Sequence, residues 1–158
     1  MRRVTIEPRT SVQQIEEGLE LAPRFGPDGL LPCITTDAVG GEVLMLGWMS
    51  LEALQRTLET REAHYWSRSR QMLWHKGAVS GLVQRVVELR IDDDQDAVWL
   101  RVQVQPGFDA PPASCHAGYR SCFYRAIDPD TGRLHFVEDG KTFDPRVVYG
   151  DAPNPTIV

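Results

Sequence analysis

Residues 82–104 read LVQRVVELRIDDDQDAVWLRVQV and place a cluster of aspartates between two segments rich in β-branched and aromatic side chains. Such side chains fit a pleated, half-buried surface, so Leu82–Ile91 and Ala97–Val104 are predicted strands. The apolar residues of Leu82–Ile91 do not alternate cleanly, which predicts either a bulge or burial on both faces. This stretch therefore predicts a β-rich domain with an acidic connection, Asp92–Asp96, between two of its strands.

The rest of the chain adds further strands and a few short helices. Apolar residues recur at helical spacing in Ser11–Glu20 and in the segment after Ser50, and both serines are N-cap candidates. Further strands are predicted at Leu30–Thr36, Glu42–Trp48, His64–Arg68, Gln71–His75, Cys122–Ile127 and Arg133–Val137. The predicted fold class is α+β, with mostly antiparallel strands and two or three helices.

Glycine- and proline-rich connections separate these elements. Val39–Gly41 is a hairpin signal, Gln105–Ser114 is a loop, and Asp128–Gly132 is a turn that lets the last two strands pair. After Val137 the chain becomes polar and proline-rich, and we expect it to be poorly ordered.

Composition and charge exclude several classes of protein. The 158 residues are 42% hydrophobic and 25% charged, which suits a single globular domain. A net charge of −5 lacks the basic surplus that nucleic-acid binding requires, so no nucleic-acid partner is expected. The chain has no apolar run of 18 residues, so no membrane span is predicted. The N-terminal residues MRRVTIEPRT are not followed by an apolar stretch of the kind that a signal peptide contains. Three cysteines, an odd number, argue against a disulfide framework, and we expect a cytoplasmic protein.

The aspartate cluster is a candidate metal site. Asp92, Asp93, Asp94 and Asp96 carry four of the five net negative charges. On an extended chain the first, third and fourth of these point to the same side, and three such carboxylates suit a hard cation such as Mg²⁺. The alternative is an ordinary acidic turn. An EF-hand is excluded, because Gly and Glu are missing at the sixth and twelfth loop positions.

The second candidate site contains sulfur. Cys115 and Cys122 have six residues between them, and His116 follows the first. Two thiols with an adjacent imidazole can hold zinc, and catalytic zinc needs only three protein ligands besides water. The alternative is a pair of cysteines that behave as small hydrophobic residues, with His116 at the surface. Cys33, in an apolar strand, is expected to lie in the core.

The third candidate site is basic. Residues 65–81 combine arginine, lysine, serine and glycine, which bind phosphates through charge-assisted hydrogen bonds and free backbone N–H groups. A solvated hairpin is the alternative.

Taken together, segments from about Leu31 to Arg125 resemble the phosphoribosyl-AMP cyclohydrolase family of histidine biosynthesis. The matching segments are EVLML (42–46), TLET (57–60), AHYWSRSR (63–70), LW (73–74), KG (76–77), SG (80–81), VQRV (83–86), the aspartate cluster and SCFYR (121–125). The resemblance implies hydrolytic opening of the N1–C6 bond of the adenine ring of 1-(5-phosphoribosyl)-AMP by a zinc-activated water. It also implies a cyclohydrolase-type fold and an intertwined homodimer whose active sites, with Zn²⁺ and Mg²⁺, lie at the subunit interface.

We expect residues 1–28 to be an N-terminal helical extension, 29–127 the cyclohydrolase catalytic domain, and 128–158 a C-terminal hairpin and tail of the same domain. The resemblance also implies metal ligands. The implied metal ligands are Asp92, Asp94 and Asp96 for Mg²⁺ and Cys115 and Cys122 for Zn²⁺. The family motif reads Asp-Cys-Asp-x-Asp, and Asp93 stands where the first zinc-binding Cys is usual. A carboxylate can bind zinc, so Asp93 is the expected third ligand and His75 its alternative.

The remaining roles concern the proton and the phosphates. His116 is the expected general acid or base, because its pKa lies near neutrality. The expected substrate-binding residues are Ser67, Arg68, Ser69, Arg70, Lys76, Gly77, Ser80, Gly81 and Arg120. Ala117 and Tyr119 depart from the family, where Thr and Arg are usual. Two other functions stay open, a non-catalytic relative that binds purine nucleotides and a structural zinc module.

Overall fold

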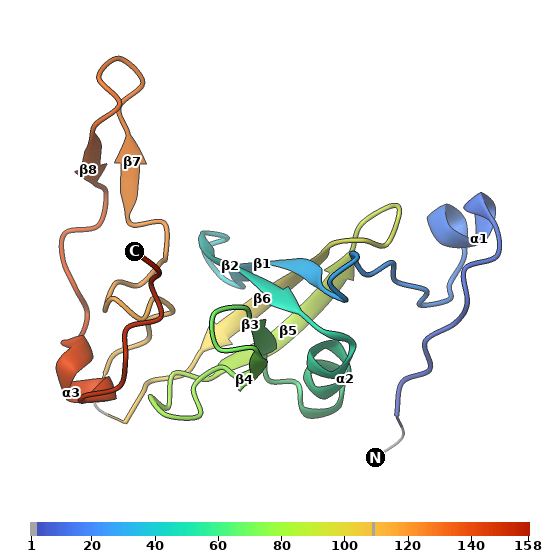
Figure 1. The fold of residues 1–158 in the computed structure, drawn as a ribbon, viewed down its shortest axis with the longest axis horizontal. Helices are drawn as coiled ribbons and strands as arrows, with labels where there is room; N and C mark the ends of the chain where they lie inside the picture. The colour runs from blue at the N-terminus through green and yellow to red at the C-terminus, as the bar shows by residue number, and fades with distance from the viewer. Residues whose placement is uncertain (1–2, 109) are drawn as a thin grey trace.

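The computed structural model describes residues 3–108 and 110–158 (Figure 1). Strands β5 (Gln84–Ile91) and β6 (Val98–Val104) form an antiparallel hairpin around the aspartate cluster. Their register shifts between Val86 and Glu88, and the extra residue, Val87, is exposed. The predicted irregularity of β5 is therefore a bulge.

A four-stranded sheet is built on this hairpin in the order β2-β1-β6-β5. β1 (Leu31–Asp37) and β2 (Val43–Met49) are antiparallel, as the turn signal between them predicted. β1 runs parallel to β6, with Cys33 opposite Val98. The fold is α+β with mostly antiparallel strands. The parallel pairing of β1 with β6 in the middle of the sheet was not predicted from the sequence.

Helix α2 (Leu51–Thr60) and a small second sheet pack next to the first one. The side chain of Ser50 accepts a hydrogen bond from the N–H of Ala53 and caps the helix, as predicted. β3 (His64–Ser67) and β4 (Met72–His75) form the second sheet. The core that these elements share includes Leu31, Cys33, Leu54, Tyr65, Val98 and Leu100. Cys33 is fully buried, which confirms the prediction that it is a core residue.

The N-terminal segment carries a short helix at the end of the molecule near the aspartate cluster (Figure 1). α1 (Val12–Glu17) is capped by Ser11, as predicted, but it ends before Leu19, which is fully exposed. Only Ile15 of this helix is buried. The helix is shorter than the apolar spacing predicted, because it ends at the C-cap Gly18, whose N–H donates to the carbonyl of Gln14.

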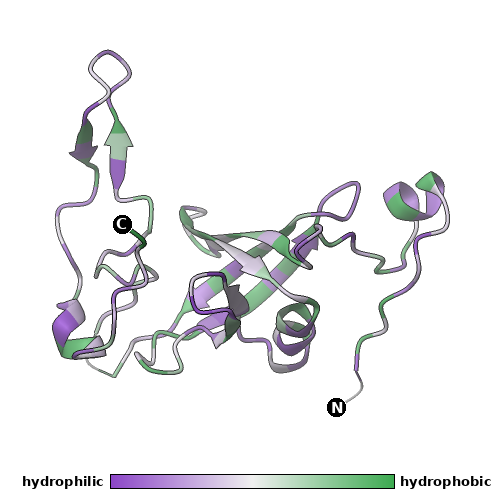
Figure 2. Ribbon diagram, viewed as in Figure 1, coloured by the Kyte–Doolittle hydropathy of each residue, from purple (hydrophilic) through white to green (hydrophobic). Residues whose placement is uncertain are grey.

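The C-terminal segment contains a hairpin arm that projects from the body (Figure 1). β7 (Arg125–Ile127) pairs with β8 (Leu134–Phe136) across the predicted turn. Hydrophobic residues occur along this arm although it projects away from the core (Figure 2). The predicted strand Cys122–Ile127 is wrong in its first half, because the N–H of Cys122 donates to the carbonyl of Leu44 instead of joining the arm.

The chain after the arm forms a short helix, so the expectation of a poorly ordered tail is wrong for this part, whereas residues 150–158 form no helix or strand. α3 (Pro145–Tyr149) follows the N-cap Asp144 and has proline in its first turn, so the proline that suggested disorder begins a helix. Phe143 and Tyr149 pack with Leu82 in a second small core. In the described part of the chain, no helix is long and apolar enough to cross a membrane.

Candidate functional site

Three predicted site residues, Cys115, His116 and Cys122, line one cavity of about 560 Å³. That volume lies within the usual range for small-molecule sites. Asn154, Thr156 and Val158 at the end of the described chain line the same cavity. The structure therefore brings the sulfur ligands and the candidate acid or base together.

A tight turn presents the first thiol. The N–H of Gly118 donates to the carbonyl of Cys115 at 3.1 Å. Gly118 has a φ of 97°, and a Cβ atom there would meet the carbonyl oxygen of Phe143 at 2.4 Å, so this turn requires glycine. The backbone N–H of Cys122 is fixed at 2.7 Å from the carbonyl of Leu44, which sets the second thiol beside β2.

The two thiols differ in their tendency to ionise. A hydrogen bond from Cys122 lowers the pKa of Cys115 to about 6, and the same contact raises the pKa of Cys122. The positive charge of Lys76 favours the thiolate form of both cysteines, because it acts to lower the pKa of each. A thiolate–thiol pair beside a buried ammonium group is a soft donor set that suits Zn²⁺.

His116 is half-buried beside this pair. Burial lowers the pKa of His116, whereas a hydrogen bond with the side chain of Asn154 raises it. The Nε2 atom of His116 lies 3.3 Å from the hydroxyl of Thr156. The imidazole therefore faces the cavity with partners on the C-terminal segment.

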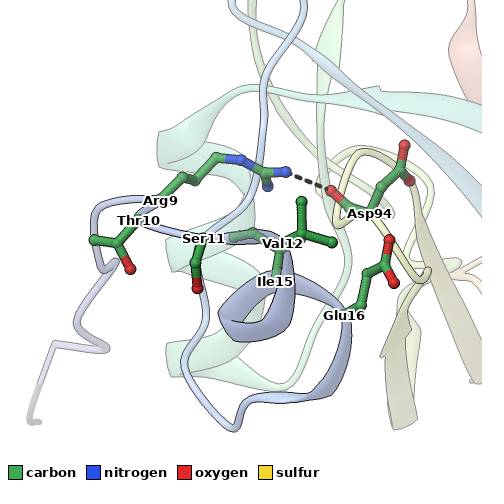
Figure 3. Close-up of a pocket in the computed structure, with 7 residues that line it drawn as sticks. All are labelled: Arg9, Thr10, Ser11, Val12, Ile15, Glu16 and Asp94. Atoms are coloured by element: carbon green, nitrogen blue, oxygen red, sulfur yellow. Dashed lines mark hydrogen bonds between the residues drawn. The ribbon is translucent and has the colours of Figure 1, made fainter.

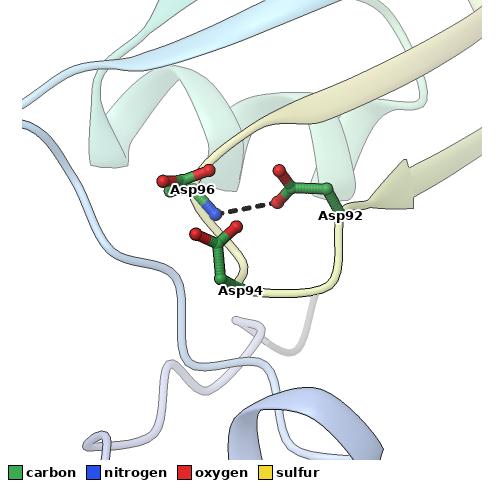
Figure 4. Close-up of side chains that lie close together, drawn as sticks. All are labelled: Asp92, Asp94 and Asp96. Carbon is green, nitrogen blue, oxygen red and sulfur yellow. Dashed lines mark hydrogen bonds between the residues drawn. The ribbon is translucent and has the colours of Figure 1, made fainter.

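The aspartate cluster forms a separate loop between β5 and β6 (Figure 4). Oxygen atoms of Asp92, Asp94 and Asp96 lie within 4.8 Å of one another. Desolvation and the neighbouring Asp96 carboxyl raise the pKa of Asp94, since a further negative charge is unfavourable there. Three close carboxylates are the oxygen ligands that Mg²⁺ prefers. Asp93 is exposed in the turn of this loop and lies outside the cluster of three.

The N-terminal segment holds this loop in place (Figure 3). Arg9 donates to the backbone carbonyl of Asp94 at 2.9 Å. Arg24 forms an ion pair of 3.1 Å with Asp96 and lowers the pKa of that carboxyl. Sequence reasoning missed both arginines, because each one is about 70 or more residues away in the chain and no local pattern signals such a contact.

The thiol pair and the aspartate loop lie at opposite ends of β5. The side-chain amide of Gln84, at the start of the strand, donates to the Ser114 hydroxyl at 3.1 Å, next to Cys115. Asp92 follows the end of the strand, whose eight residues span roughly 25 Å. Figure 1 shows the loop on the side of α1 and the thiol segment on the side of the C-terminal arm. One chain thus brings two sulfur ligands together, and its own Asp93 does not reach them.

Four of the predicted substrate-binding residues, Ser67 to Arg70, lie at the turn between β3 and β4. The guanidinium of Arg68 lies 4.8 Å from the centre of the Trp48 ring, and both serines and Arg70 are exposed or partly exposed. The charge of Arg70 contributes to the lowered pKa of His116, so this arginine lies on the side of the thiol cavity. This turn is free to contact a phosphate.

The other predicted substrate-binding residues have structural partners. Lys76 is only 3% exposed and donates to the carbonyl of Ser114. Gly77 and Gly81 have φ values of 93° and 77° and pack against backbone atoms of neighbouring loops, where a Cβ atom would clash. Ser80 is buried and its hydroxyl accepts a hydrogen bond from Leu82. These four residues thus have structural roles in the loops around Ser114, and in this structure the ammonium group of Lys76 is engaged by a backbone carbonyl.

Arg120 and His75 are also engaged elsewhere. Arg120 pairs with Asp37 at 3.1 Å and with Glu42 at 3.5 Å, at the turn between β1 and β2. The Nε2 atom of His75 lies 2.8 Å from a carboxylate oxygen of Glu62, and its ring stacks on that of His64. The structure does not bring His75 to the thiols, because side chains alternate along β4 and Lys76, the next residue, is the one that points to them.

Comparison with known proteins identifies the class and then the family. A family model described as phosphoribosyl-AMP cyclohydrolase matches residues 45–124, which include the aspartate loop and both cavity thiols. The class is therefore that of hydrolases. The relative from Rhodopseudomonas palustris (strain BisA53), named phosphoribosyl-AMP cyclohydrolase, is 53% identical over 138 residues, covering 85% of this chain and 90% of the relative. This chain belongs to the phosphoribosyl-AMP cyclohydrolase family, as the sequence motifs implied.

Two further relatives with the same name extend the match. The protein from Nitrobacter hamburgensis is 53% identical over 143 residues, which cover 89% of this chain and 93% of the relative. The protein from Rhizobium rhizogenes is 46% identical over 151 residues, which cover 94% and 99%. The similarity thus extends well beyond the segment that the family model matches.

Proposed function

We propose that this protein opens the adenine ring of 1-(5-phosphoribosyl)-AMP by hydrolysis of the N1–C6 bond, a step of L-histidine biosynthesis. The observation that carries this proposal is that the family match spans both donor sets, the thiol pair and the aspartate loop. A cavity of about 560 Å³ beside the thiols offers the space that a nucleotide needs.

Zinc fits the thiol pair in its donor chemistry. Cys115 and Cys122 would supply two sulfur ligands, and Asp93 of a second copy of the chain would supply a third ligand. When bound, Zn²⁺ makes hydroxide available near neutral pH, because it lowers the pKa of a coordinated water to about 7. Lys76 supports the site by balancing the charge of the thiolates.

Magnesium fits the aspartate loop. Asp92, Asp94 and Asp96 offer three oxygen ligands, which suit Mg²⁺, and Arg9 and Arg24 fix the loop that carries them. The charge of the cation would offset the repulsion that raises the pKa of Asp94. A bound dication would also attract the phosphates of the substrate.

The chain's own residues then bind the substrate and move the proton. Arg68 and Arg70, on the exposed turn between β3 and β4, would hold a phosphate by charge-assisted hydrogen bonds. His116 would exchange a proton with the reacting groups through its imidazole, which faces the cavity.

A homodimer completes the proposal. The thiols need a third ligand, and the roughly 25 Å of β5 keep the aspartates of the same chain away. The projecting arm and the loop before it expose large apolar side chains, namely those of Phe123, Ile127, Leu134, Phe136 and Val137. Exposed apolar patches of this kind mark protein interfaces, and the projecting arm can pack against a second copy of the chain. The three free cysteines suit a reducing compartment, so we place the reaction in the cytoplasm.

The test is ring opening by the purified protein with both metals supplied, followed by the ultraviolet spectrum of the purine. We expect turnover, about one zinc per chain, and loss of both on treatment with a chelator. Cys122→Ala should lose zinc and turnover, whereas the matched control Cys33→Ala should keep its zinc. Absence of ring opening would overturn the proposal. In that case bound zinc would favour the structural zinc module, and nucleotide binding without zinc would favour the non-catalytic relative.

A further inference from the structure

The last residues of the described chain form part of the thiol cavity. We call residues 154–158 the C-terminal strap; it contributes Asn154, Thr156 and Val158 to the cavity wall. The strap lies outside residues 45–124, the segment that the family model matches. The match to the family model therefore does not account for its contribution to the cavity.

The strap follows helix α3 and is fixed by local contacts. Tyr149 of α3 packs against the second core, which includes Phe143 and Leu82. Within the strap, the N–H of Thr156 donates to the side-chain oxygen of Asn154 at 2.8 Å. This bond fixes the backbone at the point where the strap meets the imidazole.

The strap contacts the imidazole of His116. The hydroxyl of Thr156 lies 3.3 Å from Nε2 of His116, and the side chain of Asn154, which raises the pKa of that imidazole, lines the same cavity. The partner of one ring nitrogen decides which nitrogen carries the proton and how the ring is oriented.

We propose that Thr156 is a positioning residue that fixes the orientation and the tautomer of His116, and that the side chains of Asn154, Thr156 and Val158 form one wall of the active site. This inference rests on the proposed role of His116 in ring opening. Partners of this kind commonly change activity by a factor of ten or more when they are removed. Thr156 contacts His116 through its hydroxyl group. A substitution that removes the hydroxyl but keeps the shape of the side chain therefore tests this contact alone.

The experiment compares Thr156→Val, which keeps the shape and removes the hydroxyl, with Thr156→Ser, which keeps the hydroxyl. Ile157→Ala is the matched control, since Ile157 lies in the same strap and is 83% exposed. For each zinc-loaded protein we measure kcat, KM, zinc content and the side-chain ¹⁵N chemical shifts of His116, assigned with His116→Asn.

We expect Thr156→Val to lower kcat about tenfold, to leave KM and zinc content nearly unchanged, and to shift the ¹⁵N resonances of His116. Thr156→Ser and Ile157→Ala should resemble the wild type in all four measurements. Wild-type kcat and unchanged ¹⁵N shifts in Thr156→Val would overturn the positioning role. If the wild type itself showed no turnover, the proposed function would fail, and the ¹⁵N shifts alone would decide whether Thr156 holds the ring.

Discussion

The ammonium group of Lys76 donates a hydrogen bond of 2.6 Å to the carbonyl oxygen of Ser114, the residue immediately before Cys115. The side chain is buried and lies 4.9 Å from the centre of the Trp74 ring. Burial lowers the pKa of Lys76, while the charges of Cys122 and Cys115 raise it. The ammonium group of Lys76 therefore lies away from solvent and interacts electrostatically with the two cysteines.

Lys76→Met should weaken zinc binding about tenfold, because partners outside the ligand shell commonly contribute that much to metal affinity. Without the ammonium group the thiolates bind protons more readily, and protons compete with zinc. Competition with a chromophoric chelator measures the affinity. The matched control is Lys141→Met, at an exposed position, which should bind zinc as the wild type does. Equal affinities for all three proteins would contradict this role of Lys76.

Gln95→Ala should lower the free energy of unfolding by about 2–3 kcal/mol, because buried backbone groups lose their partners. The side chain of Gln95 accepts from the N–H of Ala22 and donates to the carbonyls of Ile15 and Glu20, with distances of 2.9–3.2 Å. Hydrogen exchange of the Ala22 amide should accelerate in the same variant, since this bond anchors the N-terminal segment.

Gln71→Ala is the matched control for this loss. Gln71 also has a positive φ, 52° against 56° for Gln95, but it is exposed. Its replacement should lower the free energy of unfolding in urea by less than about 1 kcal/mol. Equal losses in the two variants would show that the backbone conformation, rather than the buried amide, determines the stability of the loop.

Asp37→Ala should lower the free energy of unfolding at pH 7 by about 1–2 kcal/mol, through lost hydrogen bonds to a charged group. The Gly40 N–H is the main cause that lowers the pKa of Asp37 below its ordinary value of 3.8, and Val39 and Arg120 add to the effect. A lowered folded-state pKa contributes stability above the unfolded value, and this stability is lost as the pH falls through the folded value. Urea unfolding should therefore show a constant difference from pH 7 to about pH 5 that shrinks below about pH 4. A difference that grows toward acid pH would contradict this assignment.

Asp93→Ala should lower the zinc content, whereas Asp93→Cys should keep or raise it, because thiolate is the softer ligand for zinc. Metal analysis of the purified proteins measures both. Full zinc content in Asp93→Ala would remove Asp93 from the ligand set. His75→Ala would then be the next variant to examine, although the His75 ring is engaged by Glu62.

Elements that depend on neighbours in sequence were predictable, and contacts between distant segments were not. The cap at Ser50, the turns before β2 and β8, and the bulge of β5 follow from residue types at short range. The parallel pairing of β1 with β6 depends on the path of the whole chain, and no periodicity reveals it.

The same distinction holds for the site. The motif around Cys115 and the aspartate pattern were readable from residue chemistry and spacing. The burial of Lys76 was not, because a lysine beside glycine has the same local pattern whether it faces a phosphate or a thiolate. The contact of Thr156 with His116 joins residues 40 positions apart, through a tail whose composition suggested disorder.

In the proposed dimer, each active site combines the thiols of one chain with the aspartate loop of the other chain. Asp94→Asn and Cys122→Ala should each abolish ring opening, and equal amounts of the two should be dissociated together and reassembled. Half of the resulting dimers then pair one variant with the other, and each such dimer contains one intact site, so about a quarter of the wild-type activity should return. A reassembled mixture as inactive as its two components, with wild-type protein recovering under the same treatment, would contradict a site built from two chains.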